Sequence, residues 1–163
     1  MQTAICPGSF DPITLGHLDV IKRASRLFER VVVCVVYNAN KTSTFTLEER
    51  MEHIRRITAE YGNVEVDCWD NLLVTYANRY ENPVVVRGLR AVSDFEYEFM
   101  MALTNKKMNS RVETIFLAAD EKYTYLSSST VKEIARYGGD ISGFVPPEIL
   151  EEVQQRFENR RNN

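Results

Sequence analysis

Short runs of β-branched residues alternate along the chain with longer segments whose apolar residues recur every three or four positions. The short runs lie at residues 2–6, 31–37, 63–67, 83–87 and 112–117. Residues 31–36 (VVVCVV) are apolar at successive positions, which is the pattern of a strand covered on both faces, as in a parallel sheet. The intervening segments predict helices at residues 16–29, 47–60, 72–80, 90–108, 130–137 and 147–160.

The order of these elements predicts the fold class. Strands and helices alternate throughout, which is typical of an α/β, doubly wound Rossmann-like domain with a five-stranded parallel sheet. We expect one domain over residues 1–163, because no linker, repeat or low-complexity tract interrupts the alternation. Within the long helix, Phe95, Phe99 and Leu103 share one apolar face.

The composition narrows the classes of function. Apolar residues make up 44% of the chain and charged residues 26%, which is enough to fill a core and keep the surface polar. The formal net charge is -3, so the basic field that nucleic-acid binding needs is absent. No apolar stretch approaches the roughly 20 residues of a membrane span, and the first residues lack a signal-peptide pattern. We therefore expect neither a nucleic-acid nor a membrane partner.

Cysteines and histidines are few. Cys6, Cys34 and Cys68 form no Cys-x-x-Cys pair, which favours a reducing compartment, and we expect the cytoplasm. With only His17 and His53, a metal site built from His and Cys is not expected. His53 lies off the apolar stripe of its helix, so we expect it to be exposed.

The turn after the first strand carries the first candidate chemistry. Residues 6–17 (CPGSFDPITLGH) lack both the G-x-G-x-x-G fingerprint and the P-loop pattern. Gly8 and Ser9 predict a tight bend, and Thr14 can cap the following helix. His17 then falls in the first helical turn, where free N–H groups and the helix dipole attract anions. The alternative is a first-turn histidine without a ligand.

Basic residues follow two other strands. Residues 87–90 (RGLR) come directly after the fourth strand, and ligands of this fold bind at the carboxyl ends of strands. Because a guanidinium presents a planar fork to phosphate oxygens, the two arginines predict a phosphate clamp. The alternative for Arg90 is a surface ion pair with Asp94 or Glu98. Lys41 follows the second strand and is either a phosphate ligand or a solvated loop residue.

A hydroxyl-rich run precedes the fifth helix. Residues 123–129 (YTYLSSS) offer hydroxyl and backbone donors to phosphate oxygens. The alternative is plain capping by Thr130 and Glu133, although a cap needs one hydroxyl and the run to Thr130 supplies four.

One face of the long helix offers a second candidate site. Tyr97, Met101 and Asn105 recur at helical spacing. They form either a packing or subunit contact, or the wall of an acceptor channel with Leu72 and Leu73 opposite.

Together these segments resemble the phosphopantetheine adenylyltransferases, over the whole chain. The T-x-G-H element marks only the nucleotidyltransferase superfamily, whereas residues 87–98 (RGLRAVSDFEYE) are more specific; residues 7–12, 45–50 and 127–133 add to the match. The resemblance implies transfer of the adenylyl group of ATP to 4′-phosphopantetheine, which gives dephospho-coenzyme A and pyrophosphate. It also implies Mg²⁺ carried by the ATP phosphates, a homohexamer, and inhibition by coenzyme A.

The same resemblance implies roles for individual residues. His17 would stabilise charge at the α-phosphate, and Lys41 and Arg87 would hold the acceptor phosphate. Ser9, also a substrate-binding residue, would flank the reaction centre with Phe10. Leu73 would touch the pantetheine arm, with Tyr97, Met101 and Asn105 in its channel. The ATP-binding residues would be Ser9, Phe10, His17, Gly88, Leu89, Arg90, Glu98, Tyr123, Thr124, Tyr125, Leu126, Ser127, Ser128 and Ser129.

Three positions depart from the usual family pattern, and four rival functions share the fold. Ser9 stands where Thr is frequent, Cys6 where an aromatic residue is common, and Thr42 where a second Lys often follows the first. A glycerol-3-phosphate cytidylyltransferase or a nicotinamide mononucleotide adenylyltransferase would differ in residues 87–98. A nucleotide-binding regulator would bind ATP without turnover. An aminoacyl-tRNA synthetase fragment would need a tRNA-binding region, for which the chain is too short.

Overall fold

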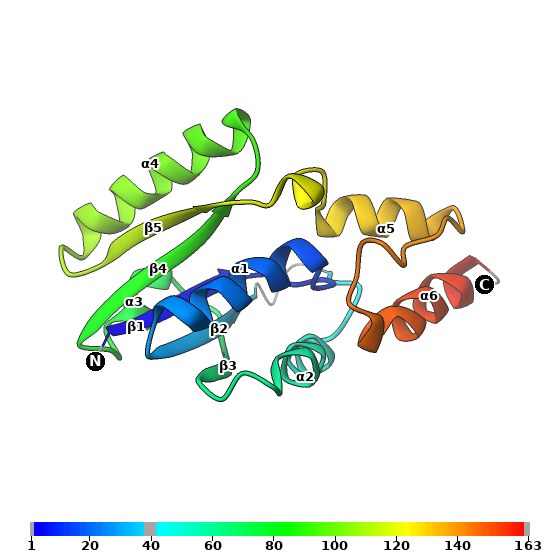
Figure 1. The fold of residues 1–163 in the computed structure, drawn as a ribbon, viewed down its shortest axis with the longest axis horizontal. Helices are drawn as coiled ribbons and strands as arrows, with labels where there is room; N and C mark the ends of the chain where they lie inside the picture. The colour runs from blue at the N-terminus through cyan, green and yellow to red at the C-terminus, as the bar shows by residue number, and fades with distance from the viewer. Residues whose placement is uncertain (1, 38–41, 162–163) are drawn as a thin grey trace.

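The computed structural model describes residues 2–37 and 42–161. Its five strands are all parallel and form one sheet in the order β3-β2-β1-β4-β5 (Figure 1). The prediction of a doubly wound sheet is therefore confirmed. The strands are β1 (Gln2–Gly8), β2 (Arg30–Val36), β3 (Val64–Trp69), β4 (Asn82–Leu89) and β5 (Glu113–Ala118).

Helices cover both faces of the sheet. One face carries the larger core, to which α1 (Leu15–Leu27), α2 (Leu47–Thr58), α5 (Ser128–Arg136) and α6 (Pro147–Arg161) contribute. The smaller core on the other face includes α3 (Leu73–Ala77), and α4 (Val92–Met108) contacts α3, β4 and β5. A short 3₁₀ turn, η1 (Glu121–Tyr123), connects β5 to α5 and was not predicted. In the described part of the chain, no helix combines the length and apolarity that crossing a membrane requires.

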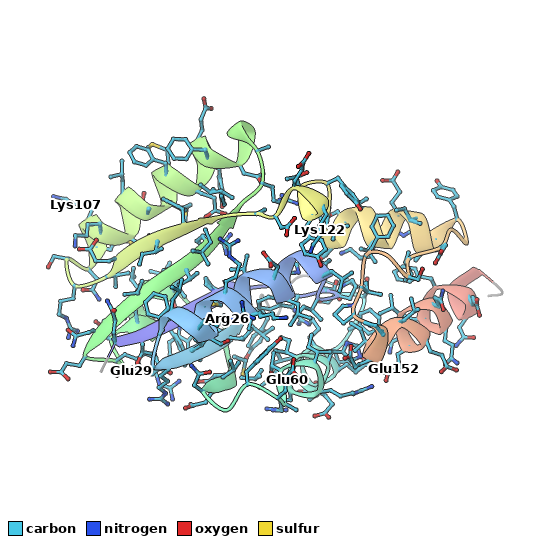
Figure 2. All side chains as sticks on the ribbon, in the orientation of Figure 1. Arg26, Glu29, Glu60, Lys107, Lys122 and Glu152 are labelled. Carbon is cyan, nitrogen blue, oxygen red and sulfur yellow. The ribbon has the colours of Figure 1, made fainter. Side chains whose placement is uncertain are left out.

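The successive apolar residues of β2 show why its pattern lacks alternation. Val31, Val33 and Val35 pack in the larger core, whereas Val32 and Cys34 pack in the smaller one. Each face of the strand is therefore buried, as parallel strands require. Charged side chains such as those of Glu60, Lys107 and Lys122 lie on the outside (Figure 2).

The strand order places a ligand crevice between β1 and β4. The chain runs outward from β1 through β2 to β3 and then crosses to β4 on the opposite side of β1. Connections leave β1 and β4 in opposite directions, and such a switch point opens a crevice at the strands' carboxyl ends. Gly88 keeps this region tight, since a Cβ there would lie 2.8 Å from Cγ2 of Val20 on α1.

Two local expectations are wrong. His53 is 2% exposed rather than solvent-exposed, because α6 packs against its helix and Glu152 hydrogen-bonds its Nε2. Helix α5 begins at Ser128 rather than at Thr130. Ser127 is the cap, because its Oγ accepts the N–H of Thr130 at 3.0 Å.

The apolar face of α4 does not enter either core. Phe95 and Phe99 are each 43% exposed and stack on one another with 5.5 Å between ring centroids. Leu103, one turn further on, is 50% exposed. The helical periodicity was therefore real, but this face of the helix is unburied within one chain.

Candidate active site

Two adjoining cavities open at the carboxyl ends of β1 and β4. The larger, about 490 Å³, lies among the β1–α1 turn, the end of β4, the first turns of α4, and the segment that leads into α5. The smaller, about 340 Å³, lies between β1, α3 and α4. They share one wall. Its residues are Pro7, Gly8, Ser9, Arg87, Tyr97 and Glu98.

His17 lines the larger cavity, and its side chain also takes part in capping the N-terminus of α1. Its Nδ1 accepts the backbone N–H of Thr14 at 3.0 Å, while Thr14 Oγ1 accepts the N–H of His17 at 3.3 Å. This is a capping box with histidine at the position where Glu or Gln is usual. Because a backbone N–H can only donate, Nδ1 is the acceptor and the proton of the neutral ring is on Nε2.

The surroundings of His17 keep it neutral. Burial lowers its pKa to about 4, and the positive charges of Arg87 and Arg90 act in the same direction. The ring also meets Phe10 edge-on, with 5.2 Å between centroids. His17 therefore offers an Nε2–H hydrogen-bond donor near pH 7, rather than an imidazolium that gives up a proton.

Arg87 lies in the shared wall and is held from two sides. Its Nε and Nη2 donate to the two carboxylate oxygens of Glu98 at 2.8 and 2.5 Å, and its Nη1 donates to the carbonyl of Pro7 at 2.7 Å. Burial alone would lower the pKa of Arg87, but the hydrogen bonds that it donates to the Glu98 carboxylate outweigh burial and raise the pKa. The guanidinium is thus a fixed positive charge where the two cavities meet.

Arg90 and the hydroxyl-rich segment also line the larger cavity. Arg90 pairs with Asp94, as the surface alternative predicted, and its Nη1 also donates to the carbonyl of Leu126 at 2.6 Å. Both residues of the pair line the cavity, so the ion pair and a ligand-binding role are compatible. Ser127, Ser128 and Ser129 line it at the N-terminus of α5, where backbone N–H groups favour an anion.

The face of α4 predicted as a channel wall does line the smaller cavity. Tyr97, Met101 and Asn105 stand there with Leu73 of α3. Leu72 does not line it and is 53% exposed. Helical spacing placed these three residues on one face but did not decide between a packing contact and a channel wall, and Leu72, one of the two residues expected opposite, lies outside the cavity.

The structure brings together most of the predicted site residues. Ser9, Phe10, Gly88, Tyr123 and Leu126 line the larger cavity with His17 and the arginines. Leu89, Thr124 and Tyr125 do not line it; Thr124 donates to the carbonyl of Glu121, and the ring of Tyr125 packs against Phe144. Lys41 and its expected phosphate contact lie outside the described residues.

Sequence reasoning missed parts of both cavities. Asp94 was considered only as a surface partner, although it precedes Glu98 by one helical turn on α4 and lines the same cavity. Thr114 of β5 and Ala102 of α4 line the smaller cavity. Helical spacing from Glu98 is the signal that would have found Asp94.

The Cys6 thiol at the site is not ionised, and the described part of the chain holds no metal cluster. Burial raises the pKa of the Cys6 thiol to about 12, although Arg87 acts in the opposite direction, so the sulfur stays protonated. Among the described residues, no three His, Cys, Asp or Glu side chains are placed to hold a metal ion. Asp94 and Glu98, the acidic residues of the larger cavity, are both paired with arginine.

Known proteins resemble this chain over most of its length. Residues 5–134 match the family described as cytidylyltransferase-like. The phosphopantetheine adenylyltransferase of Caldanaerobacter subterraneus subsp. tengcongensis is 52% identical over 96% of this chain and 98% of its own. That of Streptomyces coelicolor is 52% identical over 98% of this chain and 100% of its own. This chain belongs to the phosphopantetheine adenylyltransferase family.

Solved structures show that this adenylyltransferase family member shares its fold with more distant proteins. A putative nicotinate-nucleotide adenylyltransferase from Vibrio parahaemolyticus superposes with a TM-score of 0.66 at 18% identity, over 93% of this chain and 97% of that one. Plasmodium falciparum nicotinic acid mononucleotide adenylyltransferase, complexed with NaAD, gives 0.65 at 16% identity, over 98% and 96%. At these identities the likeness concerns the fold alone.

The charge state of His17 in this adenylyltransferase family member can be measured directly. With two histidines in the chain, an NMR titration of the ring protons is simple to assign using His17→Gln. The His17 signal is expected to stay in its neutral position as the pH falls through 6.5, and to shift only near pH 4, because burial opposes protonation. A midpoint close to the ordinary value of 6.5 would contradict the buried, neutral state assigned to His17.

Proposed function

We propose that this protein transfers the adenylyl group of ATP to 4′-phosphopantetheine, giving dephospho-coenzyme A and pyrophosphate. The observation that carries the proposal is the pair of cavities that meet at Arg87 and Ser9, with His17 beside the junction. A nucleotide in the larger cavity and an elongated acceptor in the smaller one would bring their phosphates together at that wall. Family membership fits both substrates.

The chemistry needs positioning more than proton transfer. An acceptor phosphate oxygen, largely ionised near pH 7, attacks the α-phosphorus of ATP while the bond to the pyrophosphate oxygen breaks. Arg87, fixed by Glu98, would hold the acceptor phosphate at the junction. The Nε2–H of His17 would donate to the oxygens on which negative charge grows. Arg90 and the serines before α5 would hold the departing pyrophosphate.

Magnesium enters this proposal as a companion of the nucleotide. The carboxylates of the larger cavity are both engaged by arginines, so its described residues do not form a protein-held metal site. Mg²⁺ would be bound by the phosphate oxygens of ATP and would neutralise part of their charge.

Assembly into a homohexamer is part of the same proposal. Phe95, Phe99, Met100 and Leu103 leave α4 with an exposed apolar face, and contiguous patches of this kind mark protein interfaces.

Inhibition by coenzyme A is proposed from the family resemblance, since coenzyme A contains both halves of the reaction product. The cytoplasm remains the proposed location.

The test is pyrophosphate release from purified protein with ATP and Mg²⁺. 4′-Phosphopantetheine is the acceptor, and nicotinamide mononucleotide and glycerol 3-phosphate are the controls. Release only with phosphopantetheine, with dephospho-coenzyme A as product, is the expected result. Release with another acceptor would keep the mechanism and reject the substrate. ATP binding without pyrophosphate release in the presence of any acceptor would favour a nucleotide-binding regulator.

A further inference from the structure

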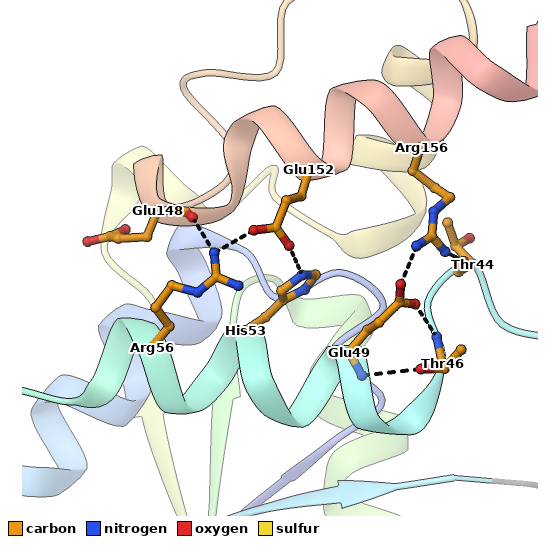
Figure 3. Close-up of polar contacts among 8 residues, drawn as sticks. All are labelled: Thr44, Thr46, Glu49, His53, Arg56, Glu148, Glu152 and Arg156. Atoms are coloured by element: carbon orange, nitrogen blue, oxygen red, sulfur yellow. Dashed lines mark hydrogen bonds and ion pairs between the residues drawn. The ribbon is translucent and has the colours of Figure 1, made fainter.

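Helix α6 contacts the loop at residues 44–46, and this loop is hydrogen-bonded to the β1–α1 turn. Figure 3 shows two groups of polar contacts between α2 and α6. In one group, Arg156 contacts Thr44, which precedes α2, and Glu49 in the first turn of α2. In the other, nearer the end of α2, Glu152 contacts His53 and Arg56. The first group differs from the second because it includes backbone atoms of the loop that precedes α2.

Arg156 makes three contacts with this loop and with the first turn of α2. Its Nη1 donates to the carbonyl oxygen of Thr44 at 2.7 Å, and its Nη2 pairs with Oε1 of Glu49. Its guanidinium also lies over the ring of Phe45, 4.6 Å from the centroid. The other oxygen of Glu49 accepts the N–H of Thr46 at 2.8 Å. Residues 44–46 are thus held from the α6 side through both backbone and side-chain atoms.

The same loop is tied on its other side to the β1–α1 turn. The two carboxylate oxygens of Asp11 accept the N–H groups of Thr44 and Phe45, each at 2.9 Å. Arg50, which is 5% exposed, donates from Nε to the carbonyl of Thr46 at 3.3 Å and from Nη1 to the carbonyl of Ser9 at 2.9 Å. A continuous set of contacts therefore runs from Arg156 through residues 44–46 to Ser9.

We propose that Arg156 is a positioning residue for the adenylyl transfer, acting through residues 44–46, Asp11 and Arg50 on the peptide of Ser9. The inference rests on the proposed function. Ser9 belongs to the wall shared by both cavities, so a displacement of its peptide changes the alignment of the two substrates. In-line transfer is sensitive to such displacements, because misplacement by an ångström can remove much of the rate advantage.

The decisive measurement compares Arg156→Gln with Arg56→Gln. Both variants remove one arginine from the contact between α2 and α6, but within the described part of the chain the hydrogen bonds of the Arg56 side chain go to Glu152 and to the carbonyl of Glu148, away from residues 44–46. Arg156→Gln is expected to lower kcat about tenfold and to change KM for either substrate less than about threefold. Arg56→Gln is expected to retain wild-type kcat, although its melting temperature should be similar to that of Arg156→Gln.

Two further measurements separate positioning from general destabilisation. Arg156→Lys keeps the charge facing Glu49 but loses the planar fork, so its kcat is expected to lie between wild type and Arg156→Gln. Amide hydrogen exchange at Thr44 and Phe45 is expected to be faster in Arg156→Gln than in Arg56→Gln, because the loop then keeps its contacts with Asp11 and Arg50 but loses the contact of Arg156 with Thr44.

The exchange experiment needs no turnover, so it keeps this inference separate from the proposed function. Equal exchange rates at Thr44 and Phe45 in the two glutamine variants would overturn the inference. Equal kcat in the two variants, measured on an active wild-type enzyme, would do the same. Wild-type protein without adenylyl transfer would instead reject the proposed function.

Discussion

Replacing His17 by alanine is expected to lower kcat at least about 100-fold, while KM for ATP changes less than about threefold. The neutral ring keeps its Nε2 proton because Thr14 occupies Nδ1, and burial holds the pKa near 4. Removing a fixed donor costs most where charge develops in the transition state and little in the ground state. Steady-state pyrophosphate release at saturating phosphopantetheine measures the effect.

Glutamine at the same position is the matched control. His17 also caps α1, so alanine removes a structural contact along with the donor. Glutamine is a usual capping-box partner and can accept the N–H of Thr14. His17→Gln is therefore expected to restore the melting temperature without restoring kcat. Alanine protein that turns over within about threefold of wild type would show that His17 is only a helix cap.

Replacing Arg87 by alanine is expected to lower kcat/KM for phosphopantetheine by about 100-fold or more, with a smaller effect on ATP binding. Arg87 is the fixed cation where the two cavities meet, and loss of a charged partner to a bound phosphate costs roughly 3 kcal/mol or more. The variant should also lose about 1–3 kcal/mol of folding free energy, because the Glu98 side chain, 12% exposed, loses its partner. Initial rates over a range of acceptor concentrations and urea denaturation give the two quantities.

The double variant Arg87→Ala with Glu98→Gln separates these two effects. Removing the unpaired carboxylate charge is expected to recover most of the lost stability and none of the lost kcat/KM. If the double variant recovered activity as well, the loss in the single variant would come from misfolding rather than from a missing phosphate ligand. Wild-type kcat/KM in the single variant would exclude Arg87 from the acceptor site.

The strands and the location of the site were predictable from the sequence because both follow from local patterns. A run such as that in β2 is apolar on both faces only when helices cover both faces. Parallel strands align their carboxyl ends, so the residues after β1 and β4 had to lie at one edge. The T-x-G-H turn was therefore placed correctly without knowledge of the strand order. The RGLR segment was placed at the correct edge of the sheet, although its residues 87–89 form the last part of β4 rather than following it.

What the sequence did not reveal depends on contacts between distant segments. His53 is off the stripe that faces the sheet, and its burial requires α6, which lies about a hundred residues further along the chain. The N-cap of α5 could have been any of several adjacent hydroxyl residues, and the sequence alone does not show that it is Ser127. The partnership of Arg87 with Glu98 also joins two elements, since Arg87 is on β4 and Glu98 is on α4, so no helical spacing predicts it.

The wall shared by the two cavities has a consequence for inhibition. A compound that fills one cavity leaves the other accessible, whereas a single molecule that bends around Ser9 and Arg87 would occupy both. Joining two weak binders makes the second contact intramolecular, at an effective concentration in the millimolar range for a short linker. Because the cavities touch, that linker needs only a few atoms. The linker would also pass Arg87, which could pair with an anionic group placed on it.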